Sequence, residues 1–531
     1  MSDQPPLRVG VLGAGIVGRE VALALIRSPE RFAPTDGRRI ELVGVAVRDV
    51  DRHAGGDIPD VLLTDAPAHL VADPEVDTIV ELMGGDEPAH TLIAVALAAG
   101  KSVVTANKHV LAHHGPELEA IARRTGATLR FEAAVGGGIP ILGLLGEDLA
   151  ANRIDRVRGV VNGTTNYILS AMARDGSDYA EVLAAAQSAG FAEADPRGDV
   201  EGDDAVNKVT ILTRLAFDTW LTPGSIPRRP PNLHGSGLPG IVGVTVEELA
   251  ASAALGLTIR LIASAGRLSA NDEDRNEAGN DARNDGGDER EARRERAETA
   301  RDQAETARDE RDARRERVET ARDRAETAGD ERDARRERVE TARDRAEMAG
   351  DEREARPQRS EMAGDEAAMA TDVFAAVLPT AVPIDGPFGQ TTGVLNRIEI
   401  DARPLGRVAV SGAGAGGGPT SSAVLGDLLA VARGRGSTWG GLPPARGGSA
   451  RESARRSPLR IQQGVGSCGW FAYLPGIRPR SVRAGEAHLY AVAAPGGIAI
   501  RSAAAPLDLV RSSVARLVDA SASITLYPID E

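Results

Sequence analysis

Short apolar runs alternate with longer segments of mixed polarity over roughly the first quarter of the chain. This alternation predicts buried strands joined by helices, the βαβ arrangement of an open α/β sheet. The runs expected to form strands are Leu7–Leu12, Ile40–Val47, Thr78–Met83, Ser102–Thr105 and Ala127–Phe131.

Beyond residue 131 the pattern mixes strands and helices, which is typical of a second, α+β domain. The expected strands are near Arg156–Val161, Val373–Leu378 and Arg397–Ile400. The expected helices are Asn166–Arg174, Tyr179–Ala189, Gly202–Phe217 and Val246–Ser264. From about residue 436 a Gly, Ser, Pro and Arg-rich linker leads to strand-like runs at His488–Val492, Ile498–Ile500 and Ser523–Tyr527, which indicate a small tail domain.

The segment 268–370 interrupts this pattern with Arg, Glu, Asp and Ala and almost no large apolar residue. Such a composition cannot form a core. The sequence ERDARRERVETARDRAETAGD at 310–330 recurs nearly unchanged at 331–351, a period of three heptads. Gly329 and Gly350 interrupt each repeat, so we expect a solvated insert, partly helical or disordered, rather than a helical assembly arm.

We therefore expect four parts. They are a Rossmann domain at 1–140 with a return segment at 406–435, a catalytic and dimerisation domain at 141–267 and 371–405, the insert at 268–370, and the linker and tail at 436–531.

Composition narrows the functional classes without naming one. The net charge of -15 among 531 residues argues against a nucleic-acid or anionic-membrane surface. Cys468 is the only cysteine, which excludes a disulfide framework and a thiolate metal cluster. No signal-peptide pattern and no membrane-length apolar run is found, so we expect a cytoplasmic protein.

The first expected strand ends in a GxGxxG sequence directly before an expected helix. Its residues are Gly13, Ala14, Gly15, Ile16, Val17 and Gly18. In a dinucleotide-binding turn the first glycine allows the tight turn, the second allows close approach of a pyrophosphate, and the third allows helix–strand packing. The position between strand and helix predicts a nicotinamide cofactor site.

Three later positions follow expected strands at the edge where open α/β sheets bind ligands: Gly84, Thr105 and Lys108. Arg48 stands where an acidic residue would bind the ribose 2′-hydroxyl of NAD. A guanidinium there favours NADP over NAD, although a solvated surface arginine explains the residue as well.

The segment 192–208 concentrates acidic residues ahead of a lysine. Asp204 and Lys208 are four positions apart, so they share one face of an expected helix. A lysine beside a carboxylate in a partly closed cleft can transfer a proton. Taken alone, this spacing is more often an ordinary surface ion pair.

Several ordered motifs closely resemble homoserine dehydrogenase over about 1–267 and 371–435. They are ELMGG (81–85), VTANK (104–108), FEAAVGGGIP (131–140), VNGTTNYIL (161–169), AEADPRGDVEGDDAVNK (192–208) and GAGAGGGPTSSAV (412–424). The resemblance implies NAD(P)H-dependent reduction of aspartate 4-semialdehyde to homoserine. It also implies that Lys208 is the acid/base and that Glu193, Asp199, Asp204 and Lys108 bind substrate.

The same resemblance implies a Na⁺ or K⁺ site at Glu132, Val135, Gly137 and Ile139, mostly through backbone oxygens. From the residues alone, a plain glycine-rich connection explains this loop equally well. The late glycine run implies that Gly414 contacts the cofactor, with a glycine hinge as the alternative. The pair Thr164–Thr165 would lie near the substrate, although two threonines opening a helix are also typical of an N-cap.

Other functions fit less well. A dehydrogenase that oxidises an aldehyde needs a nucleophilic thiol, and Cys468 lies outside the motifs. Another oxidoreductase of a small amino-acid aldehyde, a bifunctional fusion or an inactive nicotinamide-sensing scaffold would also keep the glycine motif, but the retained Lys208 and Glu193 argue against the scaffold. We expect a homodimer or homotetramer, and find no ACT-like pattern of an amino-acid-sensing domain in 460–531.

Overall fold

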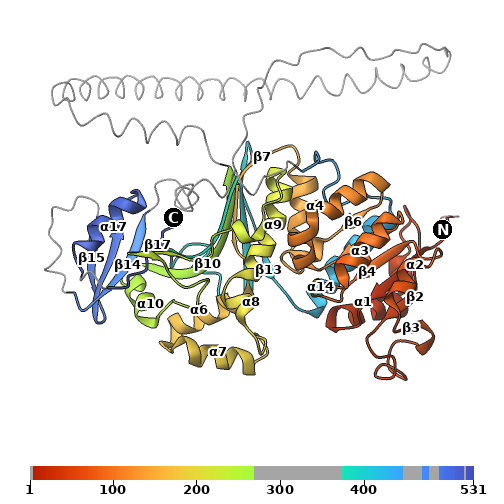
Figure 1. Ribbon diagram of the computed structural model, residues 1–531, viewed down its shortest axis with the longest axis horizontal. Coiled ribbons are helices and arrows are strands. Elements are labelled where there is room, and N and C mark those ends of the chain that lie inside the picture. The colour runs from red at the N-terminus through yellow and green to blue at the C-terminus, as the bar shows by residue number, and fades with distance from the viewer. Residues whose placement is uncertain (1–3, 268–372, 446–468, 478–488, 519–521, 531) are drawn as a thin grey trace, which may run out of the picture. The chain divides into compact units, whose positions relative to one another are not determined.

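The computed structural model describes residues 4–267, 373–445, 469–477, 489–518 and 522–530 (Figure 1). The expected insert at 268–370 and Cys468 lie outside the described residues. All described residues belong to one compact unit.

Six described strands form a parallel sheet. Its order is β3 (Leu63–Thr64), β2 (Ile40–Ala46), β1 (Leu7–Leu12), β4 (Thr78–Glu81), β5 (Ser102–Thr105) and β6 (Leu129–Arg130). The order reverses direction at β1, as it does in doubly wound dinucleotide-binding sheets. This confirms the predicted Rossmann fold, in which the short edge strand β3 was not anticipated.

Helices cover both faces of this sheet because its strands are apolar on both sides. Val9 and Val11 face a core formed with α1 (Ile16–Arg27) and α14 (Gly417–Ala432). Leu12 and Ile79 face the opposite core. That core is built with α2 (Pro67–Ala72), α3 (Ala89–Ala98) and α4 (Lys108–Thr125).

A second, antiparallel sheet holds five described strands. Its order is β11 (Val373–Pro383), β10 (Leu257–Arg267), β7 (Arg153–Val160), β12 (Leu395–Arg403) and β13 (Gly406–Ala413). The helices of this region are α5 (Ile141–Gly143), α6 (Gly163–Asp175), α7 (Tyr179–Ser188), α8 (Arg197–Val200), α9 (Asp203–Phe217) and α10 (Val246–Ala253). A small hairpin of β8 (Pro231–Asn232) and β9 (Gly235–Ser236) follows α9. The predicted combination of a Rossmann domain with a second, α+β domain is thus confirmed.

Two expectations about this region were wrong. The single helix expected at Val246–Ser264 is a helix followed by a strand, because Gly256 turns the chain at φ +73° and the β-branched run after it pairs as β10. The return to the Rossmann part starts later than residue 406, since β13 pairs with β12 in the antiparallel sheet and only α14 packs on α1.

The tail contains a third sheet of four described strands in the order β15 (Leu489–Ala494), β16 (Gly497–Ser502), β14 (Trp470–Pro475) and β17 (Tyr527–Pro528). Helix α17 (Leu507–Ala515) lies between β16 and β17 in the sequence. Every pair in the sheet is antiparallel, and the order is that of a split βαββαβ sheet. The expected strand at Ser523–Tyr527 forms only from Tyr527.

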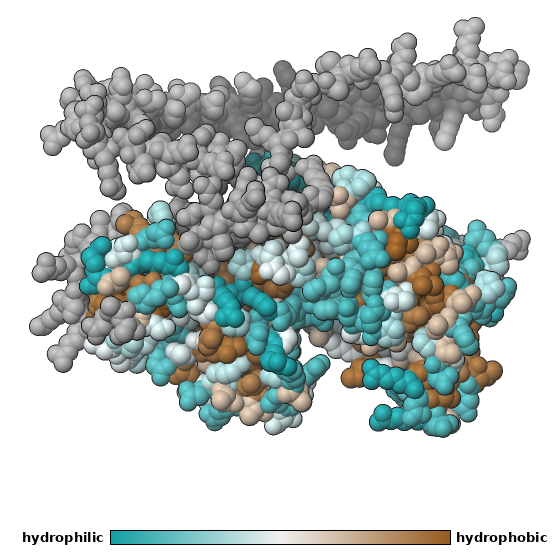
Figure 2. Space-filling model, in the orientation of Figure 1, coloured by the Kyte–Doolittle hydropathy of each residue, from teal (hydrophilic) through white to brown (hydrophobic). Residues whose placement is uncertain are grey.

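No helix among the described residues is both long enough and apolar enough to cross a bilayer. On the visible face, polar residues predominate and apolar residues form small separate areas (Figure 2).

Candidate functional site

The GxGxxG turn has the backbone geometry that a pyrophosphate requires. Gly13 has φ +98°, and a Cβ there would lie 2.7 Å from the Leu82 carbonyl oxygen. A Cβ on Gly18 would lie 1.9 Å from the Gly13 carbonyl oxygen, so the helix and the strand end approach more closely than any side chain allows. Gly15 caps α1 and has nothing within 4 Å of an added Cβ, which leaves its backbone open to a ligand.

The residues between these glycines differ in exposure. Ala14 and Val17 are half-buried, whereas Ile16 is 77% exposed at the first turn of α1. Arg48 is exposed two residues beyond the end of β2, at the carboxyl edge of the sheet.

The second glycine run lies beside the first, although about 400 positions separate them in the sequence. A Cβ on Gly417 would lie 2.4 Å from Glu20 Oε1 of α1, and Ser421 donates a hydrogen bond to Glu20 Oε2 at 3.0 Å. A Cβ on Gly414 would lie 1.9 Å from Asn396 Nδ2. Both glycine runs therefore border the same edge of the parallel sheet.

A buried glutamate that the motifs contain but that we did not single out holds the loop after β4. Glu81 Oε1 accepts the backbone N–H groups of Met83 at 2.8 Å and Gly84 at 3.3 Å. Its Oε2 accepts the Thr105 hydroxyl at 2.6 Å, so this hydroxyl is occupied inside the protein. Burial raises the pKa of Glu81. Asn107 reinforces the loop by donating to the Gly85 carbonyl at 2.8 Å.

The carboxylate of Asp204 contacts two lysines where α4 of the Rossmann part packs against α9 of the second domain. Lys208 Nζ lies 2.7 Å from Asp204 Oδ2, and Lys108 Nζ lies 3.2 Å from Oδ1. Lys208 comes from α9 and Lys108 from the first turn of α4. Lys208 is 7% exposed, whereas the Lys108 side chain is 41% exposed. The surface ion pair that the spacing alone favoured is therefore replaced by a buried lysine in a polar cluster.

Hydrogen bonds fix the direction of the Lys208 ammonium group. Lys208 Nζ donates to the Val161 carbonyl at 2.6 Å and to Asp204. An ammonium group has three N–H bonds, so one remains for a substrate atom. Burial alone raises the pKa of Asp204, but Lys208 and Lys108 outweigh this and hold it well below the usual range. The pKa of Lys108 is raised, and the negative charge of Asp204 is the main cause.

Asn162 connects the acidic run to α6, and sequence analysis did not single it out. Its Nδ2 donates to Asp199 at 2.7 Å and to Asp204 at 2.8 Å, while its Oδ1 accepts the Thr165 N–H at 2.8 Å. Asn162 is thus the N-cap of α6, a position that asparagine favours and that the pattern before the helix could have revealed. Thr164 donates a hydrogen bond to the Phe191 carbonyl at 2.8 Å and so fixes the chain directly before the acidic run 192–208.

Glu193 and Asp199 lie within electrostatic reach of Lys108, since both raise its pKa. Glu193 is exposed and Asp199 is half-buried. The structure therefore connects four of the predicted residues, Lys208, Asp204, Lys108 and Asp199, directly or through Asn162, whereas Glu193 makes no direct side-chain contact with them.

Loop 132–139 begins with a half-buried carboxylate, that of Glu132. Glu132 accepts the N–H groups of Leu142 at 2.8 Å and Gly143 at 2.7 Å. Burial raises its pKa to about 7. Val135, Gly137 and Ile139 are buried beside it in the chain, and a Cβ on Gly137 would lie 2.8 Å from the Gly414 carbonyl group. A half-buried carboxylate whose oxygens already accept backbone N–H groups could also bind a hard cation, which would offset the cost of partly burying the charge.

The scarcity of lysine is a signal that sequence analysis overlooked. Only three of the 63 Lys and Arg residues are lysine, namely Lys101, Lys108 and Lys208. Two of them meet at Asp204. Lys101 instead donates to the Val76 carbonyl at 2.8 Å and to that of Asp73. In a chain that uses arginine almost everywhere, two lysines at one carboxylate single out this cluster.

Comparisons with known proteins agree with this geometry. The profile of the homoserine dehydrogenase NAD-binding domain matches residues 13–132, and that of homoserine dehydrogenase matches 140–279 and 331–429. A homoserine dehydrogenase of Mycobacterium tuberculosis is 35% identical over 433 residues, which cover 82% of this chain and 74% of the relative.

Solved structures extend the comparison. A homoserine dehydrogenase crystal structure from Thiobacillus denitrificans has a TM-score of 0.67 at 27% identity and covers 99% of each chain. A hyperthermophilic archaeal homoserine dehydrogenase in complex with NADPH shares the fold, with a TM-score of 0.50 at 21% identity over 80% of this chain and 97% of its own.

Proposed function

The chain belongs to the homoserine dehydrogenase family and is an NAD(P)-dependent oxidoreductase; from this premise we propose that Lys208 is its acid/base. The nicotinamide, when bound, supplies the hydride to the aldehyde carbon of aspartate 4-semialdehyde. During this reduction Lys208 gives its free N–H proton to the aldehyde oxygen. In the reverse reaction, homoserine oxidation, it takes the proton back. The observation that carries this role is the buried Nζ held by Val161 and Asp204.

Asp204 orients Lys208 and keeps Lys108 charged beside the substrate. Both contacts, at 2.7 and 3.2 Å, support this positioning role. The substrate carries an ammonium group that needs an anionic partner, and the exposed Glu193 with the half-buried Asp199 supplies one. Lys108 then binds the substrate carboxylate.

The cofactor occupies the edge bordered by both glycine runs, in contact with Gly13 to Gly18, Gly84, Thr105 and Gly414. Thr105 acts through its backbone, because its hydroxyl is bonded to Glu81. Arg48 selects NADP by pairing with the 2′-phosphate. Its exposure at the end of β2 supports this role.

A monovalent cation, Na⁺ or K⁺, binds at Glu132 and the carbonyl oxygens of Val135, Gly137 and Ile139. The raised pKa of Glu132 supports it, since a cation would keep this carboxylate ionised.

A homodimer or homotetramer in the cytoplasm completes the proposal. Strand β13 is an edge of the antiparallel sheet, and a second copy can cover it. Light scattering after size-exclusion chromatography measures this assembly.

Homoserine-dependent NADP reduction tests the role of Lys208. We expect Lys208→Ala to lower kcat by about 10²–10⁴-fold with a smaller change in KM. Lys208→Arg keeps the charge, but guanidinium is too weak an acid for transfer, so it should remain impaired. Lys101→Met removes the lysine outside the cluster and should leave kcat near wild type. A Lys208→Ala enzyme with wild-type turnover would contradict the proposal.

A further inference from the structure

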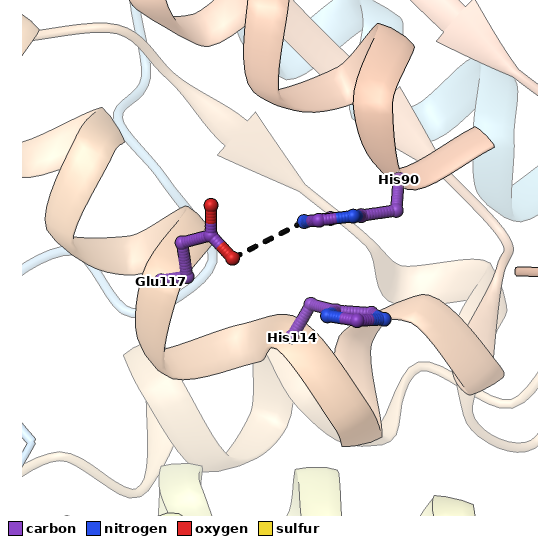
Figure 3. Close-up of side chains that lie close together, drawn as sticks. All are labelled: His90, His114 and Glu117. Atoms are coloured by element: carbon purple, nitrogen blue, oxygen red, sulfur yellow. Dashed lines mark hydrogen bonds and ion pairs between the residues drawn. The ribbon is translucent and has the colours of Figure 1, made fainter. Parts of the chain in front are cut away.

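Four of the eight histidines of the chain lie on two neighbouring helices. His90 is in the first turn of α3, whereas His109, His113 and His114 are on α4. The rings of His90 and His114 stack with centroids 3.9 Å apart and an interplanar angle of 14° (Figure 3). None of these histidines belongs to the catalytic cluster proposed above.

A carboxylate completes the group. Glu117 follows His114 by three positions, so both side chains share one face of α4. Its Oε2 lies 3.2 Å from His90 Nε2, and Figure 3 shows the carboxylate directed at that ring. One nitrogen or oxygen from each of His90, His114 and Glu117 lies within 4.8 Å of the others.

Two further carboxylates hold the outer nitrogens of the rings. His90 Nδ1 lies 3.1 Å from Glu87 Oε1, and His114 Nε2 lies 2.8 Å from Asp86 Oδ1. His90 Nε2 and His114 Nδ1 are therefore the nitrogens that can face an ion. A carboxylate behind a ligating histidine is the arrangement that fixes the tautomer and raises ligand basicity in metal sites.

We propose that His90, His114 and Glu117 bind one divalent transition-metal ion of the Zn²⁺ class. Two imidazoles and one carboxylate suit Zn²⁺, whereas Mg²⁺ and Ca²⁺ prefer sets of oxygen ligands. Tetrahedral Zn²⁺ with bonds of about 2.0–2.2 Å needs ligand atoms about 3.3 Å apart, so binding requires side-chain rotations that bring the three ligand atoms together and separate the stacked rings. Water takes the fourth position, because these side chains are 17%, 27% and 56% exposed.

Such an ion would join the first turn of α3 to the middle of α4. Asp86 and Glu87 directly follow Gly84 and Gly85, which border the proposed cofactor edge. Metal binding would therefore hold in place a loop next to the nicotinamide, although the ion itself would not contact the reacting groups. The partial exposure of the site makes the ion exchangeable.

Metal binding is measured on the full chain, purified without a histidine tag and stripped with EDTA. Titration calorimetry with ZnCl₂ and elemental analysis after dialysis should give one saturable Zn²⁺ ion per chain. We expect His90→Gln and His114→Gln each to weaken this binding by more than about tenfold, and Asp86→Asn to weaken it by roughly tenfold. Circular dichroism checks that each variant is folded.

His69→Gln is the control, since His69 is an exposed histidine on α2 outside this group, and this variant should retain the ion. Co²⁺ gives a second readout, since visible absorption typical of four-coordinate Co²⁺ should appear in wild type and be lost in Glu117→Gln. The proposal is overturned if wild type shows no saturable Zn²⁺ binding in the micromolar range. It is also overturned if binding persists undiminished in His90→Gln and His114→Gln.

Discussion

Replacing Glu119 by glutamine should loosen the contact between α4 and α9, the two helices that carry Lys108 and Lys208. Glu119 lies on α4 and accepts hydrogen bonds from Arg214 of α9, Nε at 2.8 Å and Nη2 at 2.7 Å. Arg123 Nε and Trp220 Nε1 donate to the same carboxylate, each at 2.8 Å. The Arg214 side chain is 0% exposed and that of Glu119 is 4% exposed, so water cannot replace either partner.

The size of the loss follows from this burial. Glutamine keeps the shape but removes the charge, and its NH₂ group faces N–H donors. Removing one partner of a buried ion pair costs about 3–5 kcal/mol, because the other charge stays buried without compensation. Arg214 retains the Pro443 carbonyl at 2.7 Å and Asp218 at 3.5 Å, so we expect the lower end, about 3 kcal/mol.

Differential scanning calorimetry measures the effect. For a unit of this size about 3 kcal/mol corresponds to a fall in Tm of roughly 4 °C. Burial tends to raise the pKa of Glu119, but its donors, Arg214 first, hold it below the usual range. The carboxylate therefore stabilises the fold above its unfolded pKa of about 4.3, and this contribution disappears as pH falls through the lower folded pKa. The difference between wild type and variant should accordingly shrink in acid.

Glu41→Gln is the matched control, since Glu41 pairs with Arg39 at 3.4 Å on the surface. We expect this exposed pair to contribute less than about 1 kcal/mol. A fall in Tm for Glu119→Gln no larger than that of the control would refute the reasoning. A double-mutant cycle with Arg214→Met should show a coupling above about 2 kcal/mol, because the pair is direct and buried.

Three other predictions follow from single features. Arg48→Ala should lower kcat/KM with NADP and leave NAD nearly unchanged; equal losses for both cofactors would make it a surface residue. With its pKa raised from 4.5 to about 7, Glu132 favours the folded state below pH 4.5 and loses this contribution as pH rises through about 7. In buffer with only a large organic cation, the Tm of wild type should fall more steeply over that range than that of Glu132→Gln, and Na⁺ or K⁺ should remove the difference; parallel profiles without the small cation would contradict this. Arg267 pairs with Val373 at the ends of β10 and β11. A two-residue Asn-Gly turn replacing 268–372 should therefore leave a folded, active enzyme. An insoluble or inactive product would show that the insert is structural.

The Rossmann part was largely predictable because its strands are buried on both faces. Continuous apolar runs such as Leu7–Leu12 and Ser102–Thr105 match the observed strands at both ends. The glycines of the cofactor turn were equally readable, since Gly13 and Gly18 satisfy backbone demands that no other residue meets.

Prediction was weaker where pairing decides the conformation. The run after Gly256 is apolar enough for either a helix or a strand, and pairing with β11 and β7 makes it a strand. Residues 406–413 alternate as an edge strand, but only their partner β12 shows to which sheet they belong.

The sequence by itself determined the family, the doubly wound nucleotide part and the residues of the acidic run, because local spacing and motif order carry that information. Only the tertiary structure decided that Asp204 serves two lysines from different helices, that Asn162 ties Asp199 to it, and that His90 faces Glu117. Apart from the pair Asp204–Lys208, which is four positions apart, those contacts join segments from 27 to 96 positions apart, and no local pattern encodes such distances. They exist because the packing of α4 against α9 and α3 brings the segments together.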